Sequence, residues 1–181
     1  MLLQRILSAL ILIPIIFAAI WFSELWFTIL VAVVALLGSW EFHNLAPFSW
    51  MPLTIFGLLW SLLIILDAYF GGEYTTPVLA STLVLPFVIS LITPKRRGEA
   101  FTMWTWTTCG ILYVGLLLSY YVMTRGLAYG REWVILAIFA TFATDTCAFF
   151  IGRALGRHPL APMLSPGKTW EGAAGGLLGG I

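Results

Sequence analysis

The stretch ILVAVVALL, at residues 29–37, is an uninterrupted apolar run without any alternation of polar and apolar residues. A strand of a transmembrane barrel alternates lipid-facing and lumen-facing residues, so this run favours a helix. Similar runs recur along the chain, because 61% of its 181 residues are hydrophobic and only 9% are charged. Soluble domains carry about 25% charged residues, and lipid-exposed backbone must satisfy its hydrogen bonds within a helix. The sequence therefore predicts an all-α, polytopic integral membrane protein.

The apolar runs define six predicted transmembrane helices and the start of a seventh, judged against a hydrocarbon core of about 30 Å. The six are expected at about residues 1–22, 25–40, 51–70, 74–92, 101–123 and 133–151. The seventh is expected to begin near Pro166 and to continue to the end of the sequence. No linker or composition shift divides the chain, so residues 1–181 are expected to form a single transmembrane domain.

The nine lysine and arginine residues are distributed unevenly between the predicted loops. If the N-terminus is cytoplasmic, seven lie on that side: Arg5, Lys95, Arg96, Arg97, Arg153, Arg157 and Lys168. The opposite side then receives only Arg125 and Arg131. Because basic residues favour cytoplasmic loops, this bias orients the spans of the multi-pass protein, which we expect in the inner (plasma) membrane. Its N-terminus and the connector at residues 152–168 are expected to face the cytoplasm.

Asp145 is an ionisable residue inside the sixth predicted span, which is otherwise apolar. A carboxylate within a membrane is costly, and this makes Asp145 a candidate functional residue. We favour a Mg²⁺ ligand facing a water-accessible cleft, because hard divalent cations prefer oxygen ligands. The alternative is a structural carboxylate paired with Arg153 or with a helix end. By contrast, Asp67 and His43 are expected to be ordinary residues of the membrane interface.

The residues SPGKT, at 165–169, resemble the start of a helix. Ser165 suits an N-cap and Pro166 the first turn. Lys168 and Thr169 would then lie beside free backbone amides, an arrangement that attracts phosphate groups. A P-loop is excluded, because the position of its first glycine is Pro162 and no strand is expected before it. The sequence therefore predicts a phosphate cradle, with simple helix capping as the alternative.

Charged residues and glycines surround this predicted helix start. The connector before it contributes further candidate substrate-binding residues, namely Arg153, Arg157 and His158. Glu171 follows it by one turn and is equally suited to be a ligand or a cap partner. After it comes a series of small residues that favours close approach between membrane helices: Gly172, Gly175, Gly176, Gly179 and Gly180. We expect this packing to help build the cleft.

The sequence DTCAFFIGRALGRHPLAPMLSPGKTWEG, at residues 145–172, strongly resembles the phosphatidate cytidylyltransferase (CDP-diacylglycerol synthase) family. The stretch QRILSALILIP, at residues 4–14, and Trp40-Glu41 are also similar, though less specific. The resemblance implies transfer of CMP from CTP to phosphatidate, with release of pyrophosphate and a requirement for Mg²⁺. It further implies that Asp145 and Lys168 are catalytic and that Asp145 holds the metal. The implied substrate-binding residues are Arg153, Arg157, His158, Ser165, Thr169 and Glu171.

The chain departs from the family in one respect, because the family's C-terminal signature with further metal-binding carboxylates does not occur in it. We therefore expect the N-terminal part of a longer enzyme, inactive by itself. The expected partners are CTP, phosphatidate and the lipid bilayer; a homodimer is left open, and no nucleic acid is expected. The alternative class is a transporter or lipid-binding protein for an anionic substrate, with Asp145 coupling an ion.

Overall fold

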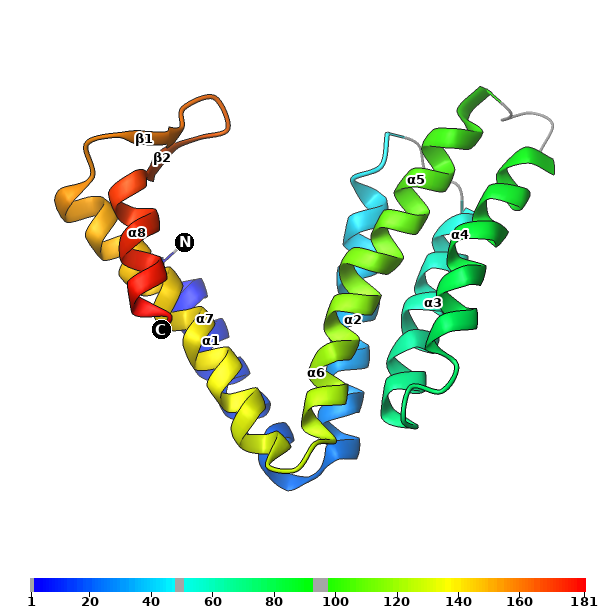
Figure 1. Cartoon of the computed structure of the whole chain (residues 1–181), viewed down its shortest axis with the longest axis horizontal. Coiled ribbons are helices and arrows are strands. Elements are labelled where there is room, and N and C mark those ends of the chain that lie inside the picture. Colours follow the sequence, from blue (N-terminus) through cyan, green and yellow to red (C-terminus); the bar gives the residue numbers. More distant parts are fainter. Residues whose placement is uncertain (1, 48–50, 93–97) are drawn as a thin grey trace. The chain divides into compact units, whose positions relative to one another are not determined.

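The computed structural model describes residues 2–47, 51–92 and 98–181, and these residues are mostly helical (Figure 1). The chain divides into two compact units, residues 1–130 (unit 1) and residues 131–181 (unit 2). Each unit has its own packing, which follows from the apolar runs of its sequence. The predicted fold class is therefore confirmed in its main feature, the dominance of helices.

Unit 1 contains the first five predicted spans as helices. They are α1 (Leu2–Phe22), α2 (Glu24–Asn44), α3 (Met51–Tyr69), α4 (Thr75–Ile92) and a continuous helix formed by α5 (Ala100–Gly110), η2 (Ile111–Leu116) and α6 (Leu117–Arg125). The segment η2 is a π-helix, which the sequence did not predict. Its Gly115 packs so closely on α3 that an added Cβ would lie 2.8 Å from the Cα of Ser61.

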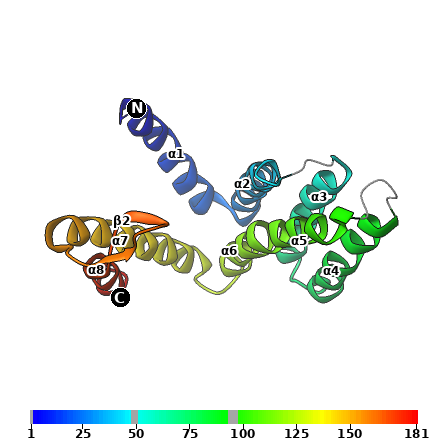
Figure 2. The ribbon, with the colours of Figure 1, turned by 90° about the horizontal axis from the view of Figure 1, so that it is seen from above.

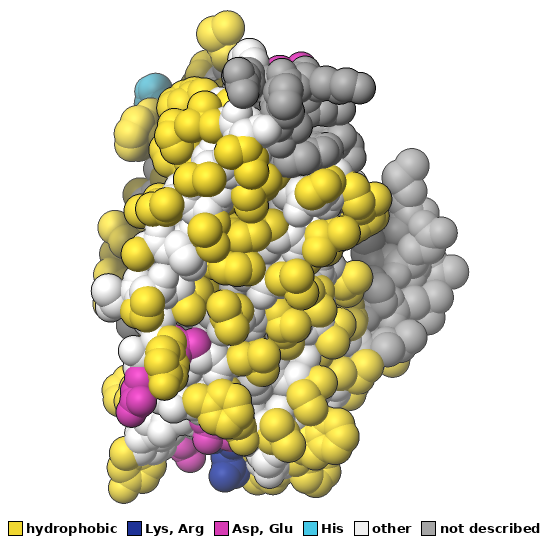
Figure 3. Space-filling model, turned by 90° about the vertical axis from the view of Figure 1, so that its right-hand side faces the viewer, with side chains coloured by type: hydrophobic (Ala, Val, Ile, Leu, Met, Phe, Trp, Pro, Cys, Tyr) yellow, Lys and Arg dark blue, Asp and Glu magenta, His cyan; other side chains and the backbone are white. Residues whose placement is uncertain are grey.

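Five of the described helices are long and apolar enough to cross a membrane. They are α2, α3, α4, the continuous helix over residues 100–125, and α7 (Gly130–Leu155) of unit 2. Helix α1 has 21 residues, and its stretch Leu12–Phe22 is apolar. Hydrophobic side chains cover most of the described part of the face shown in Figure 3. The exposed large apolar side chains of unit 1 include Leu83, Val84 and Phe87 of α4. Exposed apolar surface on this scale marks a partner surface or a membrane, and the apolar helices indicate an integral membrane protein.

Arg125 joins the ends of two helices in unit 1. Its Nε and one terminal guanidinium nitrogen donate hydrogen bonds to the Ile20 carbonyl oxygen, at 3.3 and 3.1 Å. The carboxyl ends of α1 and α6 therefore lie on the same side of unit 1, as the predicted alternation of spans requires. Of the predicted cytoplasmic cations, the Arg5 side chain and residues 95–97 lie outside the described residues.

His43 is buried inside unit 1, although the sequence placed it at a membrane interface. Its side chain is 6% exposed, and its Nδ1 lies 2.7 Å from the Ser39 carbonyl oxygen. Space for the ring comes from Gly57 of α3, where an added Cβ would lie 2.5 Å from the imidazole. A neighbouring glycine on another helix is not apparent from one sequence, so the burial of His43 was not predicted.

Asp67, also expected at a membrane interface, organises the start of α4. Its buried carboxylate accepts hydrogen bonds from the Tyr74 amide at 2.9 Å and from the Thr75 hydroxyl at 2.5 Å. The turn between the two helices uses Gly71 and Gly72, both at positive φ, where glycine carries no steric cost. Asp67 therefore pairs with the amide of Tyr74, which precedes α4, and with the hydroxyl of Thr75, the first residue of that helix.

Unit 2 consists of α7, a small antiparallel hairpin and α8 (Trp170–Gly179). The hairpin pairs β1 (Pro159–Ala161) with β2 (Ser165–Thr169), with Pro159 opposite Thr169. This corrects two predictions, since the fold is not purely α and the last helix does not begin at Ser165. Ser165 lies in β2, and Thr169 is the N-cap instead, with an extended backbone (φ −125°, ψ 155°). The Thr169 hydroxyl accepts a hydrogen bond from the Gly172 amide at 3.2 Å.

The glycines of α8 face α7, and the two helices lie side by side in Figures 1 and 2. An added Cβ at Gly172 would lie 2.8 Å from the Ala148 carbonyl oxygen. At Gly176 it would lie 2.9 Å from the Ala148 Cβ. The predicted close packing through small residues is therefore confirmed. It brings the start of α8 against the part of α7 that carries Asp145.

Candidate functional site

A cavity of about 620 Å³ lies within unit 2, between α7, the hairpin and the first turn of α8. It is bordered by Asp145, Ala148, Phe149, Gly152, Arg153, Leu160, Gly167, Lys168, Thr169, Gly172 and Ala173. Four candidates from the sequence therefore border one cavity: Asp145, Arg153, Lys168 and Thr169. Arg157, His158, Ser165 and Glu171 do not border it.

The spacing along α7 explains how its residues reach the cavity together. Positions three, four and seven residues apart lie on one face of a helix, and this relates Asp145 to Ala148, Phe149 and Gly152. The helix ends at Leu155, four residues later than predicted. Asp145 thus lies about 15 Å from that end rather than roughly 9 Å. Gly152 is a site residue that the sequence analysis missed, and its spacing of seven from Asp145 was the available signal.

The Asp145 side chain is exposed and, within the described part of the chain, forms no hydrogen bond or ion pair. The alternative in which Asp145 is a structural partner of Arg153 therefore has no support in this geometry. The cavity instead holds one carboxylate together with the Arg153 guanidinium and the Lys168 ammonium. These two cations give the cavity a surplus of positive charge, which suits an anionic ligand.

The donor set of the cavity is compatible with Mg²⁺ only if the ligand supplies part of the coordination. Among the described residues, no group of three or more His, Cys, Asp or Glu side chains could hold a metal. Asp145 is the only carboxylate among the residues that border the cavity. Mg²⁺ is commonly bound by one or two carboxylates together with phosphate oxygens and water. Asp145 therefore fits a magnesium ion shared with a phosphate-containing substrate.

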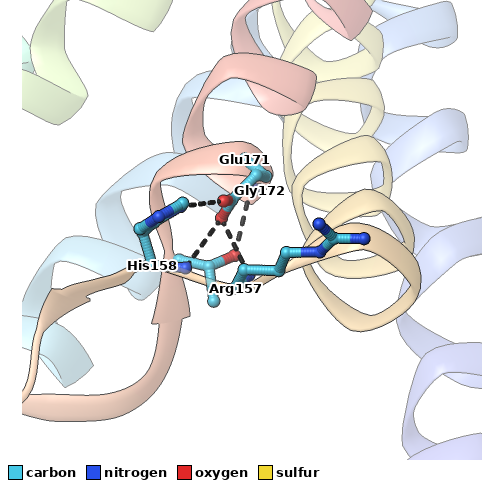
Figure 4. A network of polar contacts seen from close by, with 5 residues as sticks. Arg157, His158, Glu171 and Gly172 are labelled. Carbon is cyan, nitrogen blue, oxygen red and sulfur yellow. Dashed lines mark hydrogen bonds and ion pairs between the residues drawn. The ribbon is translucent and has the colours of Figure 1, made fainter.

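Glu171 fastens the base of the hairpin to the start of α8 (Figure 4). Its Oε2 accepts hydrogen bonds from the backbone amides of Arg157 and His158, at 3.2 and 3.3 Å. Its Oε1 lies 2.6 Å from Nδ1 of His158. The His158 side chain, followed by backbone amides, lowers the pKa of the Glu171 carboxyl from about 4.5 to about 2. Glu171 was considered either as a ligand or as a cap partner, and these contacts favour a structural role over that of a ligand.

A backbone hydrogen bond also joins the start of α8 to the residue before β1. The Trp170 amide donates to the His158 carbonyl oxygen at 3.0 Å, and Thr169 caps α8 as described. Lys168 therefore precedes the N-cap in an extended strand and does not lie in the first helical turn, so the predicted cradle geometry is wrong. Lys168 borders the cavity from β2, whereas the first turn of α8 borders the same cavity with Gly172 and Ala173.

Comparison with known proteins identifies the class. A family model described as "Cytidylyltransferase family" matches residues 3–181. The chain belongs to the cytidylyltransferase family, which confirms the resemblance inferred from residues 145–172.

Curated relatives share one printed name, phosphatidate cytidylyltransferase. The protein of Pseudomonas aeruginosa is 30% identical over 187 residues, which cover 98% of this chain and 67% of that protein. The protein of Brucella suis is 34% identical over 130 residues, covering 71% and 43%. The protein of Staphylococcus haemolyticus is 30% identical over 125 residues, covering 68% and 47%. The matched region thus spans two thirds of the first relative and about half of the other two.

Proposed function

We propose that this chain carries the nucleotide-transfer site of an enzyme that moves CMP from CTP to phosphatidate. The products are CDP-diacylglycerol and pyrophosphate. The observation that carries the proposal is that Asp145, Arg153 and Lys168 border one cavity of unit 2. It lies within the family match, and the relatives' printed name supports the choice of acceptor.

The reaction brings several anions together, which is its main electrostatic difficulty. A phosphate oxygen of phosphatidate attacks the α-phosphorus of CTP, the bond between the α-phosphorus and the α,β-bridging oxygen breaks, and pyrophosphate leaves. Arg153 and Lys168 reduce the repulsion between the reactants and stabilise charge that develops during transfer. Asp145 would hold Mg²⁺, which supplies further charge neutralisation and orients phosphate oxygens.

The two substrates approach from different phases, and this accounts for the position of the site on α7. CTP is soluble, whereas phosphatidate remains in the lipid leaflet. A cavity on the carboxyl-terminal half of a long apolar helix, beside a basic connector, is suited to both. The proposal includes a cytoplasmic location for residues 152–168, because CTP is found on that side.

The direct test is an assay of the full-length protein reconstituted with phosphatidate and CTP labelled in its cytosine ring. We expect label to appear in the lipid fraction, with one pyrophosphate released per lipid formed. Diacylglycerol, which lacks the attacking phosphate, is the control acceptor and should give no labelled lipid. Absence of transfer to phosphatidate by well-folded protein would refute the proposed function.

A further inference from the structure

The turn of the hairpin in unit 2 exposes two large apolar side chains. Met163 is 99% exposed and Leu164 is 91% exposed. They lie between β1 and β2, in the turn that joins the two strands of the hairpin (Figure 1). Two short strands cannot cover these side chains themselves, so unit 2 leaves them without apolar neighbours.

The position of the hairpin relative to α7 brings this turn close to a membrane surface. Helix α7 has 26 residues, so it is roughly 39 Å long. This exceeds the roughly 30 Å of a hydrocarbon core, and its carboxyl end therefore reaches the headgroup layer. The strand β1 begins at Pro159, four residues after Leu155. The hairpin thus lies within reach of the bilayer interface, whichever side of the membrane it occupies.

The charges around the hairpin favour a lipid surface over other apolar partners. The segment from residue 153 to residue 172 contains Arg153, Arg157 and Lys168. Its only acidic residue is Glu171, which is occupied by His158 and two backbone amides. Basic segments beside a membrane helix are attracted by anionic headgroups. Apolar side chains on such a segment enter the layer between headgroups and acyl chains.

We propose that Met163 and Leu164 insert into the interfacial layer of the protein's own membrane and anchor the hairpin there. The same hairpin supplies Leu160, Lys168 and Thr169 to the wall of the cavity. Anchoring its turn therefore fixes that wall at the depth of lipid phosphates. This consequence rests on the proposed function, whereas the insertion itself does not.

The test places a fluorescent label at the turn in a background with Cys109→Ala and Cys147→Ala. Met163→Cys and Leu164→Cys are labelled separately with bimane and reconstituted in phosphatidylcholine–phosphatidylglycerol vesicles. Spin-labelled lipids then report contact with the bilayer, and iodide reports contact with water. Leu136→Cys, at an exposed position of α7, is the lipid-facing reference. Gly167→Cys is the comparison within the hairpin, because an added Cβ there meets no atom within 4 Å.

We expect the labels at 163 and 164 to show blue-shifted emission, quenching by spin-labelled lipid and protection from iodide. The label at 167 should remain accessible to iodide. Quenching of 163 and 164 by iodide alone would overturn the proposal, because the turn would lie in water. Protection from both quenchers would also overturn it, because protein, either a second copy or another segment, would then cover the turn.

An activity measurement distinguishes failure of the anchor from failure of the proposed function. If both inferences hold, Met163→Asp with Leu164→Asp should raise the phosphatidate concentration needed for half-maximal transfer and leave the KM for CTP unchanged. Equal dependence on phosphatidate in this variant and the parent would contradict the anchor's role in substrate access. The fluorescence result stands in either case, since it requires no transferase activity.

Discussion

Lys168 borders the proposed site although its structural setting differs from the predicted one. It lies in β2 rather than in a helical turn, and it still borders the cavity with Asp145 and Arg153. As a point charge with a flexible stem, it can reach a phosphate from a strand as well as from a helix. The role proposed for Lys168 therefore requires its charge beside the cavity and does not require the helix amides that were predicted around it.

We predict that Lys168→Met lowers kcat/KM for CTP by roughly 10²-fold, the range for loss of one group that stabilises developing charge. The measurement is CMP transfer against CTP concentration, in full-length protein of confirmed fold. Lys95→Met removes the same charge at the chain's other lysine and is the matched control. An unchanged kcat/KM in Lys168→Met would leave this lysine with a surface role only.

Glu171 has a separate residue-scale prediction, because it fastens the hairpin through three hydrogen bonds. Glu171→Gln removes the charge and one of the two acceptor oxygens. We expect faster hydrogen exchange at the amides of residues 157–169, with little change in the middle of α7. Because the pKa of Glu171 is lowered on folding, its stabilising effect is present above about pH 4.5 and is lost as the pH falls toward about 2. Unchanged exchange at neutral pH would show that the hairpin is held by other contacts.

At the scale of elements, the contact between α7 and α8 depends on residues without side chains. We predict that Gly172→Ala destabilises the protein by about 1–3 kcal/mol, the usual cost of overpacking. The added Cβ would meet a backbone oxygen of Ala148, which cannot rotate away. Gly167→Ala is the control, since that position is open. Thermal unfolding in detergent should separate the two variants, and equal midpoints would refute this account of the interface.

The helices of unit 1 could be predicted well because apolar runs and turn residues mark them directly. The third and fourth spans were placed within one residue of α3 and α4. The hairpin was missed because Ser165 and Thr169 are both good N-caps, and the sequence alone does not rank them. The π-helical segment was missed because its sequence is as apolar as the α-helix around it.

The candidate site could be predicted only where its residues are related by local sequence patterns. Helical periodicity relates Asp145 to Gly152, and local charge patterns indicate Arg153 and Lys168. The contacts of Glu171 with the backbone of residues 157 and 158 need the chain reversal that the hairpin produces. That pairing could not follow from a prediction in which residues 165–169 open a helix.

At the scale of the whole molecule, the distribution of cations predicts opposite sides for two loops. Arg157→Cys reports the connector, and Leu127→Cys reports the exposed turn after α6. In a background without Cys109 and Cys147, an impermeant thiol reagent should label position 157 only from the cytoplasmic side. Position 127 should react only from the opposite side. Labelling of both positions from one side would contradict the predicted orientation.

The central claim is that the cavity of unit 2 carries out Mg²⁺-dependent CMP transfer, and Asp145→Asn tests it most directly. This change keeps the size of the side chain and removes the charge that would hold the metal. Glu73→Gln, at an exposed position between α3 and α4, makes the same chemical change away from the cavity. Both variants of the full-length protein are assayed for CMP transfer to phosphatidate over a range of Mg²⁺ concentrations. We predict at least a roughly 10²-fold lower rate for Asp145→Asn and a near-normal rate for Glu73→Gln; a near-normal, Mg²⁺-dependent rate in Asp145→Asn would contradict the claim.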